Sequence, residues 1–266
     1  MSRIKTCLQN LQSQKKTALI PYIVAGDQGR SATLATLHAM VAAGADILEL
    51  GVPFSDPMAE GSIIQKAHER ALACGMSLCD VLDLVREFRS TDAYTPIVLM
   101  GYANPVERMG YAAFADAASA AGVDGLLTVD IPSEEAADIN QELQRVGIDN
   151  IFLLAPTTTD ARAKHICELA TGYLYYVSLK GVTGAGNIDT KEVSEKLASF
   201  RQYTKLPICV GFGIKDAESA RAIAQVAEGV VIGSVLVACM EKNSGSSDAL
   251  IAQSVADIIA GIRKVL

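Results

Sequence analysis

A single acidic residue interrupts the apolar run Ile47-Leu48-Glu49-Leu50. A carboxylate in a buried strand is costly unless it is paired or faces a cavity. Glu49 is therefore a candidate for proton transfer, with a structural ion pair as the alternative. The loop that follows adds Ser55, Asp56 and Glu60, although Asp56 and Glu60 taken alone are typical solvated loop acids.

Glycines gather in three loops that each follow a predicted strand. The three segments are Gly181-Val182-Thr183-Gly184-Ala185-Gly186, Gly211-Phe212-Gly213 and Gly233-Ser234. Converging backbone N–H groups at a helix N-terminus form an anion pocket, so these loops predict a phosphate site. No GxxxxGK[ST] sequence occurs, which argues against nucleotide hydrolysis of the P-loop kind. Lys180 as a Schiff-base lysine is the weaker alternative, because a loop position would not desolvate its amine.

Short apolar runs alternate with helical stretches along the whole chain and must position these residues. The runs are continuously apolar, as in strands buried on both faces. Strands are expected at residues 19–24, 47–50, 97–100, 125–129, 150–154, 173–177, 208–210 and 230–232. Helices are expected at residues 31–43, 77–89, 133–146, 158–170, 190–200 and 217–227. Ser133 and Asp216 are expected to cap two of them, each just before an acidic first turn.

Eight such units, with no linker rich in Pro, Ser or charge, predict a single α/β domain over residues 1–266. The expected fold is a (β/α)8 TIM barrel with extra N-terminal and C-terminal helices. A doubly wound open sheet is the alternative, but GxGxxG is missing after the first strand. The phrases Ala43-Gly44-Ala45-Asp46 and Ala121-Gly122-Val123-Asp124 precede strands and suggest repeated helix C-caps. In such a barrel the active site lies at the C-terminal strand ends.

Composition limits the function classes. The 266 residues carry 23 Lys and Arg against 30 Asp and Glu, a net charge of −7, which disfavours nucleic-acid and anionic-membrane partners. A hydrophobic content of 50% excludes disorder. The 6 cysteines lack CxxC spacing and the 3 histidines lack HxxxH spacing, so we expect reduced thiols, no metal site and a cytoplasmic protein. No export signal or membrane span is expected.

The chain resembles the tryptophan synthase alpha subunit family along its whole length. The segments that carry the resemblance are Leu48-Glu49-Leu50-Gly51-Val52-Pro53-Phe54-Ser55-Asp56-Pro57, Asn104-Pro105, Asp130-Ile131-Pro132-Ser133-Glu134-Glu135, Gly181-Val182-Thr183-Gly184, Gly211-Phe212-Gly213-Ile214 and Gly233-Ser234. The resemblance implies a lyase of tryptophan biosynthesis. It would cleave indole-3-glycerol phosphate to indole and glyceraldehyde 3-phosphate by a retro-aldol step. It also implies an α2β2 heterotetramer with the beta subunit, and no cofactor.

The resemblance also implies site residues. Glu49 would move protons at indole C3 and at the adjacent hydroxyl, and Glu60 would stabilise the charge that develops at the ring N–H. The implied substrate-binding residues are Tyr22, Met100, Leu127, Val129, Tyr175, Thr183, Phe212 and Ile232. The implied phosphate-binding residues are Gly184, Gly213, Gly233 and Ser234. The implied partner contacts are Pro53, Asp56, Asn104 and Pro132. For Tyr22, Met100, Leu127, Val129 and Ile232, barrel core is the competing interpretation.

Two positions depart from the family pattern. Ala59-Glu60-Gly61 stands where the family usually has Ala-Asp-Gly, and Leu179 follows Ser178 where Arg is common. A misplacement of about 1 Å can cost roughly 100-fold in rate, but we expect Glu60 to remain competent. A non-catalytic activating subunit of the beta chain is one alternative function. Another phosphate-binding barrel, an aldolase or an isomerase, is the second.

Overall fold

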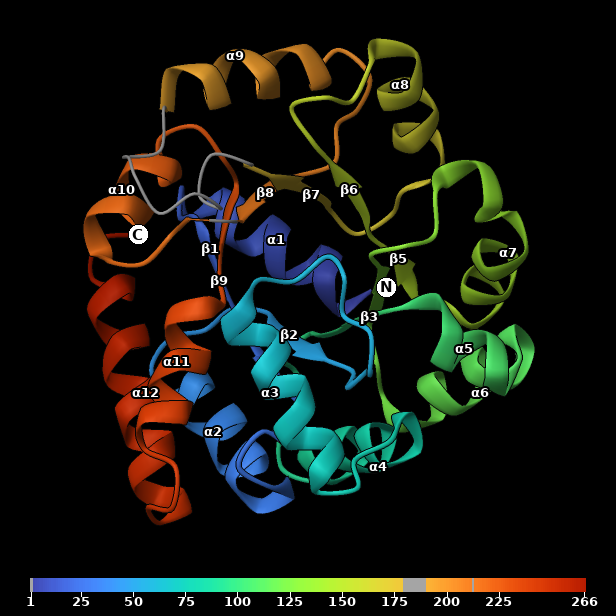
Figure 1. The fold of residues 1–266 in the computed structure, drawn as a ribbon. Helices are drawn as coiled ribbons and strands as arrows, with labels where there is room; N and C mark the ends of the chain where they lie inside the picture. The colour runs from blue at the N-terminus through green and yellow to red at the C-terminus, as the bar shows by residue number, and fades with distance from the viewer. Residues whose placement is uncertain (1, 179–189, 212) are drawn as a thin grey trace.

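Parallel strands form one curved sheet at the centre of the molecule, inside a ring of helices (Figure 1). The computed structural model describes residues 2–178, 190–211 and 213–266. The strands of this part are β1 Ala18–Val24, β2 Leu48–Gly51, β3 Ile97–Gly101, β4 Gly125–Thr128, β5 Asp149–Asn150, β6 Phe152–Leu154, β7 Leu174–Val177, β8 Ile208–Gly211 and β9 Gly229–Ile232. Their order is β5-β4-β3-β2-β1-β9-β8-β7-β6. The predicted barrel is confirmed.

The expected strand at residues 150–154 is divided in two. β5 pairs with β4, whereas β6 pairs with β7, and Ile151 lies between them. The Ile151 N–H still donates to the Leu126 carbonyl at 2.9 Å. Residues 149–154 therefore join the two ends of the sheet, and the eight predicted strands appear as nine segments in the described ranges because one of them changes partner midway.

Helices follow most strands and cover the outside of the sheet. They are α1 Arg3–Ser13, α2 Arg30–Ala42, α3 Ser62–Ala73, α4 Leu78–Arg89, α5 Ala103–Met109, α6 Tyr111–Ala121, the 3-10 turn η1 Ser133–Glu135, α7 Ala137–Val146, α8 Asp160–Leu169, α9 Thr190–Phe200, α10 Ala217–Ala224, α11 Ser234–Lys242 and α12 Asp248–Arg263. The expected terminal helices are α1 and α12. In the described ranges, no helix combines the length and the apolar content that a membrane span requires.

One of the two named helix caps is correct. Asp216 accepts the Ser219 N–H at 2.8 Å and caps α10 in a reciprocal capping box. Ser133 is not the cap of α7, because residues Ser133–Glu135 form a separate 3-10 turn and α7 begins after Ala136. The Ser133 hydroxyl donates to Glu134 instead.

Alternate strand residues fill the barrel interior, and α1 closes one end of it. The interior cluster contains Ala18, Ile20, Ile47, Val98, Leu127, Ile151, Tyr173, Tyr175, Cys209 and Val231. Ile4, Leu8 and Leu11 of α1 belong to the same cluster. A β-carbon on Gly125, the first residue of β4, would lie 3.0 Å from Ile4 Cδ1, so α1 covers the N-terminal strand ends. The opposite, C-terminal ends remain available for a site.

The repeated Gly-x-Asp phrases have a structural role. The Asp124 N–H donates to the Ile97 carbonyl at 2.9 Å, and its carboxylate accepts the Ile97 N–H at 2.8 Å. The same pair of bonds joins Asp46 to Leu19 and Glu228 to Ile208. The expected glycine C-caps also occur: Gly122 ends α6 with φ 89° and Gly44 has φ 104°. The phrases therefore mark the repeating unit of the barrel.

Asp124→Ala is expected to lower the free energy of unfolding by about 3 kcal/mol, because it leaves two arginines without their carboxylate partner. Asp124 is buried, and its carboxylate also binds Arg89 at 2.7 Å and Arg3 at 2.8 Å. Denaturant unfolding at constant m-value measures the change. Asp83→Ala is the matched control, because Asp83 pairs with Arg86 on an exposed face and should change stability by no more than about 0.5 kcal/mol. Equal effects of the two substitutions would contradict the prediction.

Candidate active site

Glu49 lies in β2 with its side chain buried in the barrel interior. The Tyr173 hydroxyl donates to Glu49 Oε1 at 2.5 Å, and Oε2 has no partner among the residues that the structure describes. Burial raises the pKa of Glu49 to about 7, the Tyr173 hydrogen bond opposes this shift, and the negative charge of Glu60 adds to it. The alternative interpretation, a structural ion pair, finds no cationic partner for Glu49 among the described residues, and Glu49 is a buried carboxyl group with a pKa near neutrality.

Glu60 lies in the loop between β2 and α3, close enough to Glu49 for their charges to interact. Burial raises the pKa of Glu60 to about 7 as well. Two neighbouring carboxyl groups with raised pKa values do not readily ionise together. Near neutral pH the pair tends to hold one proton. Glu49 is fully buried and Glu60 only partly so, which favours a protonated Glu49 beside an ionised Glu60.

Three side chains from outside the β2–α3 loop hold its backbone, and one of them, Gln65 of α3, donates to the Glu60 carbonyl at 2.8 Å. The Ala59 N–H donates to the Tyr102 hydroxyl oxygen at 3.1 Å. The Phe54 N–H donates to His68 Nδ1 at 3.1 Å. Burial lowers the pKa of His68 to about 4, so its ring is neutral at pH 7 and Nδ1 can accept. These bonds hold the loop at Phe54 and at Ala59, the residue before Glu60.

Two tyrosines line the space beside Glu49 because neighbouring glycines make room for them. A β-carbon on Gly51 would lie 2.5 Å from Tyr22 Oη, and one on Gly211 would lie 2.0 Å from Tyr175 Oη. The Tyr22 hydroxyl is buried without a partner in the described ranges. The charges of Glu49 and Glu60 both raise the pKa of each tyrosine, after burial itself. The structure thus brings Tyr22, Tyr175 and the two acids together.

Part of the predicted phosphate site lies in described segments. Gly213 has φ 77°, a left-handed conformation that favours glycine. Gly233 precedes α11, and no side chain caps that helix. Ser234 is its first residue, and the Ser234 and Val235 N–H groups have no backbone partner in the described ranges, so they can meet an anion. Thr183, Gly184 and Phe212 lie outside the described residues.

The remaining predicted slot residues are buried or partly buried in the barrel. Leu127 is fully buried, and the partly buried Val129 packs against the same interior cluster. Met100 at the end of β3 is partly buried and touches both hydrophobic clusters. Ile232 is fully buried in the main cluster, which also contains Tyr22. Their assignment to an indole slot stays a prediction.

The predicted partner contacts differ in exposure. Asp56, Asn104 and Pro132 are exposed, whereas Pro53 is buried and offers a partner little surface. Met58, which was not among the predicted contacts, is 79% exposed in the same loop as Asp56. An apolar side chain this exposed is a better contact candidate than Pro53.

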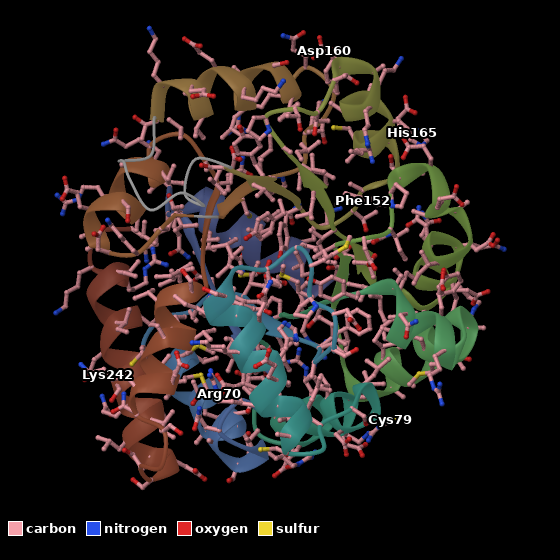
Figure 2. The ribbon with its side chains drawn as sticks, in the orientation of Figure 1. Arg70, Cys79, Phe152, Asp160, His165 and Lys242 are labelled. Carbon is pink, nitrogen blue, oxygen red and sulfur yellow. The ribbon has the colours of Figure 1, made fainter. Side chains whose placement is uncertain are left out.

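A buried ion pair fixes the loop after β1. Arg70 of α3 binds both carboxylate oxygens of Asp27, at 2.7 and 3.0 Å, and reaches Glu241 of α11 at 3.0 Å. Figure 2 shows Arg70 on the side of α3 that faces α2 and α11. The network ties the first strand end to two helices and makes no contact with Glu49.

Metal ligands do not gather in the described part of the chain, where no group of three His, Cys, Asp or Glu side chains could hold an ion. His165 lies on α8 at the perimeter (Figure 2). His38 stacks on Phe88 with ring centroids 4.7 Å apart. Of the three histidines, His68 alone contacts the loop of the candidate site.

Three side chains that contact Glu49 or the β2–α3 loop were not predicted from the sequence: Tyr173, Tyr102 and His68. Tyr173 had a signal, because it precedes Tyr175 by two residues and so shares its face of the strand. Tyr102 directly follows β3, which is a favoured site position in a barrel. His68 had no signal, because its partner Phe54 lies 14 residues away across a loop.

The arrangement suits proton transfer in a shielded site. A buried carboxyl group with a pKa near 7 can both donate and accept a proton at neutral pH. A second, partly exposed carboxylate can stabilise positive charge beside it. Backbone N–H groups at α11 can hold an anion at the rim.

Known proteins resemble this chain over its full length. The sequence model described as tryptophan synthase alpha chain matches residues 8–260. The tryptophan synthase alpha chain of Neisseria meningitidis serogroup A is 57% identical over 99% of this chain and 100% of its own length. The crystal structure of tryptophan synthase subunit alpha from Legionella pneumophila str. Paris has a TM-score of 0.92 at 42% identity, covering 100% of this chain and 98% of that one. A chain of the tryptophan synthase a2b2 complex from Pyrococcus furiosus has a TM-score of 0.84 at 38% identity, with coverages of 92% and 97%.

Proposed function

Because this chain belongs to the tryptophan synthase alpha chain family, it is a lyase that cleaves indole-3-glycerol phosphate to indole and glyceraldehyde 3-phosphate, and we propose that Glu49 and Glu60 carry the chemistry. The observation that carries this assignment is the environment of Glu49. Its carboxyl group is fully buried, one oxygen is held by Tyr173, the other has no partner among the described residues, and its pKa is about 7.

The first step is protonation of indole C3. The bond to break joins C3 to the glycerol chain, and an indole carbanion would be a poor leaving group. Glu49 in its protonated form donates to C3, which gives a tetrahedral carbon beside a positively charged C=N–H group. The Glu60 carboxylate accepts the ring N–H and stabilises that charge. A protonated Glu49 beside an ionised Glu60 is the charge state that these two roles require.

The second step is retro-aldol cleavage. Glu49, now ionised, removes the proton of the hydroxyl next to the bond. The O–H electrons form the aldehyde C=O, and the C3–C bond electrons form C2=C3 and return the ring nitrogen to neutrality. Glu49 ends protonated, as it began, so the cycle consumes no proton and needs no cofactor.

The other predicted residues orient the substrate within this proposal. Tyr175 and Tyr22 flank the two acids and would contact the indole and glycerol parts. Gly213, Gly233 and Ser234, with Gly184, would hold the phosphate through backbone N–H groups. Holding the distal phosphate fixes the scissile bond against Glu49 and so contributes to rate as well as affinity.

The partner is a tryptophan synthase beta subunit. The Pyrococcus furiosus structure is described as a mutually activating a2b2 complex, and this chain is accordingly the alpha subunit of an α2β2 assembly. We propose that Asp56, Met58, Asn104 and Pro132 contact the beta subunit, because all four are exposed and lie in the segments that follow the C-terminal ends of β2, β3 and β4. We also propose that residues 1–266 work as one unit in the cytoplasm.

Indole release from indole-3-glycerol phosphate, with and without beta subunit, tests the proposal. The expected result is indole formation by the alpha chain alone and a higher rate after the beta subunit is added. Stimulation of the beta subunit with no indole formed would point to the non-catalytic alternative. Turnover of sugar phosphates that lack an indole ring would point to another barrel aldolase or isomerase.

A further inference from the structure

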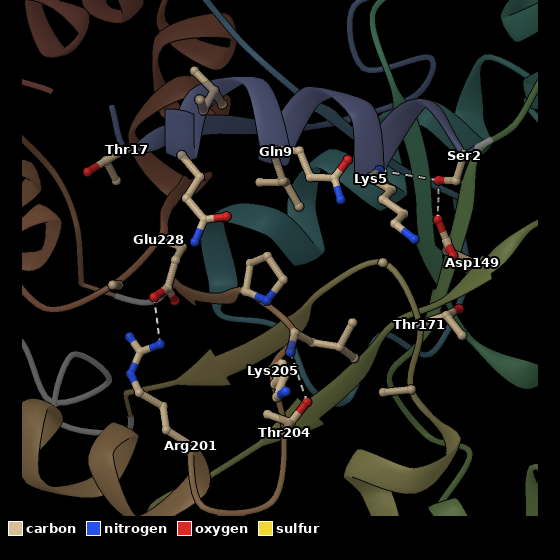
Figure 3. Close-up of a pocket in the computed structure, with 18 of the residues that line it drawn as sticks. Ser2, Lys5, Gln9, Thr17, Asp149, Thr171, Arg201, Thr204, Lys205 and Glu228 are labelled. Atoms are coloured by element: carbon tan, nitrogen blue, oxygen red, sulfur yellow. Dashed lines mark hydrogen bonds and ion pairs between the residues drawn. The ribbon is translucent and has the colours of Figure 1, made fainter. Parts of the chain in front are cut away.

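A cavity of about 740 Å³ lies at the N-terminal strand ends, opposite the candidate active site. Its walls are α1 on one side and the segments that lead into β7, β8 and β9 on the other (Figure 3). None of the assigned site residues lines it. The volume lies in the range of small-molecule pockets, about 300 to 1,000 Å³.

The inner wall of this cavity is apolar. Leu8 and Leu11 of α1 line it on the helix side, and Leu206, Pro207 and Ala227 line it on the strand side. The cavity exists because α1 closes the barrel end through Ile4, Leu8 and Leu11 but does not fill the space toward β8. An apolar ligand group could replace water there at a gain.

The rim of the cavity is basic, although the whole chain is acidic. Five basic side chains line it, against two acidic ones: Lys5, Lys15, Lys16, Arg201, Lys205, Asp149 and Glu228. Arg201 and Glu228 neutralise each other at 2.5 Å. The four lysines form no ion pair within 4 Å in the described part of the chain. The excess of basic over acidic side chains gives this cavity a net positive lining in a chain of net charge −7, which attracts anions.

Local structure at the end of α1 places two of these lysines. The Lys16 N–H donates to the Leu11 carbonyl and the Lys15 N–H to the Gln12 carbonyl, both at 3.0 Å, which is the Schellman pattern of helix termination. Lys15 takes the left-handed position with φ 56°, where glycine is usual. The turn brings Lys15 and Lys16 to the rim instead of extending α1 past it.

We propose that this cavity binds a small amphipathic anion, with a carboxylate or phosphate head at the lysine rim and an apolar body against the Leu8, Leu11 and Leu206 wall. A ligand must satisfy both parts of the cavity. An inorganic anion would leave the apolar wall in contact with water, and a neutral apolar ligand would leave the lysines without an anionic partner. Figure 3 shows Lys5 and Lys205 on opposite sides of the same opening, one on α1 and one before β8. A head group between them would bridge the helix and the barrel.

Hexyl phosphate is a suitable probe, titrated into the full isotope-labelled chain and followed through backbone amide resonances. Glycerol 3-phosphate is kept in excess to occupy the active-site phosphate pocket. The expected result is saturable shifts at Thr171, Gly172 and Lys205, which line the cavity, with no further shift at Gly233. Hexanol and inorganic phosphate, the two halves of the probe, should each bind at least about tenfold more weakly.

A double variant, Lys5→Gln with Lys205→Gln, is expected to weaken hexyl phosphate binding about tenfold. The matched control is Lys164→Gln with Lys242→Gln, which removes two exposed lysines outside the cavity and should change affinity less than twofold. Absence of shifts at the cavity amides would overturn the proposal, as would equal binding by the two double variants. Hexanol binding as well as the probe, or inorganic phosphate doing so, would also overturn it. Indole release is not the readout, so this test is independent of the proposed function.

Discussion

Glu49→Gln is expected to lower kcat for indole release by roughly 10³-fold, because glutamine can neither donate nor accept the proton that the reaction moves twice. The substitution keeps the shape of the side chain, and the Tyr173 hydroxyl can still donate to the remaining amide oxygen. The loss should appear in kcat and kcat/KM alike, since substrate binding depends on other groups. Indole release at substrate saturation measures it.

Tyr173→Phe is the matched control for Glu49→Gln. It removes the hydrogen bond that lowers the pKa of Glu49, so the pKa should rise above about 7 while the carboxyl group remains. If protonated Glu49 starts the reaction, the decline of kcat/KM at high pH will move to higher pH in this variant, with only a modest loss at the optimum. An unchanged pH profile, or an active Glu49→Gln enzyme, would remove Glu49 from the proton-transfer role.

The same burial that tunes Glu49 destabilises the fold as the pH rises. The carboxyl group has a pKa of about 7 in the folded chain and 4.5 as its ordinary value. Between these values the folded state binds more protons than the unfolded state, so stability falls as pH increases through this range. The Glu49→Gln variant does not lose this stability, because glutamine does not ionise. At pH 8 the variant should therefore melt no lower than the parent, which separates lost chemistry from lost folding.

The fold was predictable because its signals are local and repeated. Continuously apolar runs such as β8 Ile208–Gly211, each followed by a helix, specify a parallel sheet covered by helices. The division of residues 149–154 was not predictable, since it arises from closing the ring: β5 follows β4, β6 follows β7, and Ile151 absorbs the change of partner. Ser133 is not the cap of α7, because Ser133–Glu135 form a 3-10 turn and α7 begins only after Ala136.

Candidate acids were predictable where they break a pattern. Glu49 stands out in an apolar strand. The hydrogen bond from the Tyr173 hydroxyl to one of its oxygens, however, exists only because Tyr173, just before β7, lies across the barrel interior from β2. No fixed spacing in the sequence signals a contact between strands on opposite sides of the barrel. Glu60 could not be distinguished from an ordinary solvated loop acid by its sequence context. Its raised pKa comes from burial between elements that approach only in the folded barrel.

Glu60→Ala is expected to reduce kcat/KM by roughly 100- to 1,000-fold, the range expected when one preorganised electrostatic partner is removed. Glu60→Gln should lose somewhat less, since an amide oxygen can still accept the ring N–H without the charge. Only the ionised carboxylate stabilises the protonated indole, and the pKa of Glu60 is about 7. Parent activity should therefore fall as pH drops below neutrality, and this acid limb should disappear in Glu60→Gln. Indole release across pH 5 to 9 measures both effects.

Glu60→Asp tests whether the longer side chain is matched to this particular loop. The loop backbone has little freedom to compensate: the Ala59 N–H is held by Tyr102, the Glu60 N–H donates to the Pro57 carbonyl at 3.1 Å, and the Glu60 carbonyl accepts from Gln65 Nε2 at 2.8 Å. Shortening the side chain by one methylene therefore withdraws the carboxylate by more than about 1 Å, and the expected loss is roughly 10- to 100-fold. Tyr102→Phe combined with Glu60→Asp frees the loop at Ala59 and should recover part of that loss. If Glu60→Asp alone matches the parent, the backbone clamp does not set the reach of the acid, and if Glu60→Ala matches it, Glu60 has no part in the reaction.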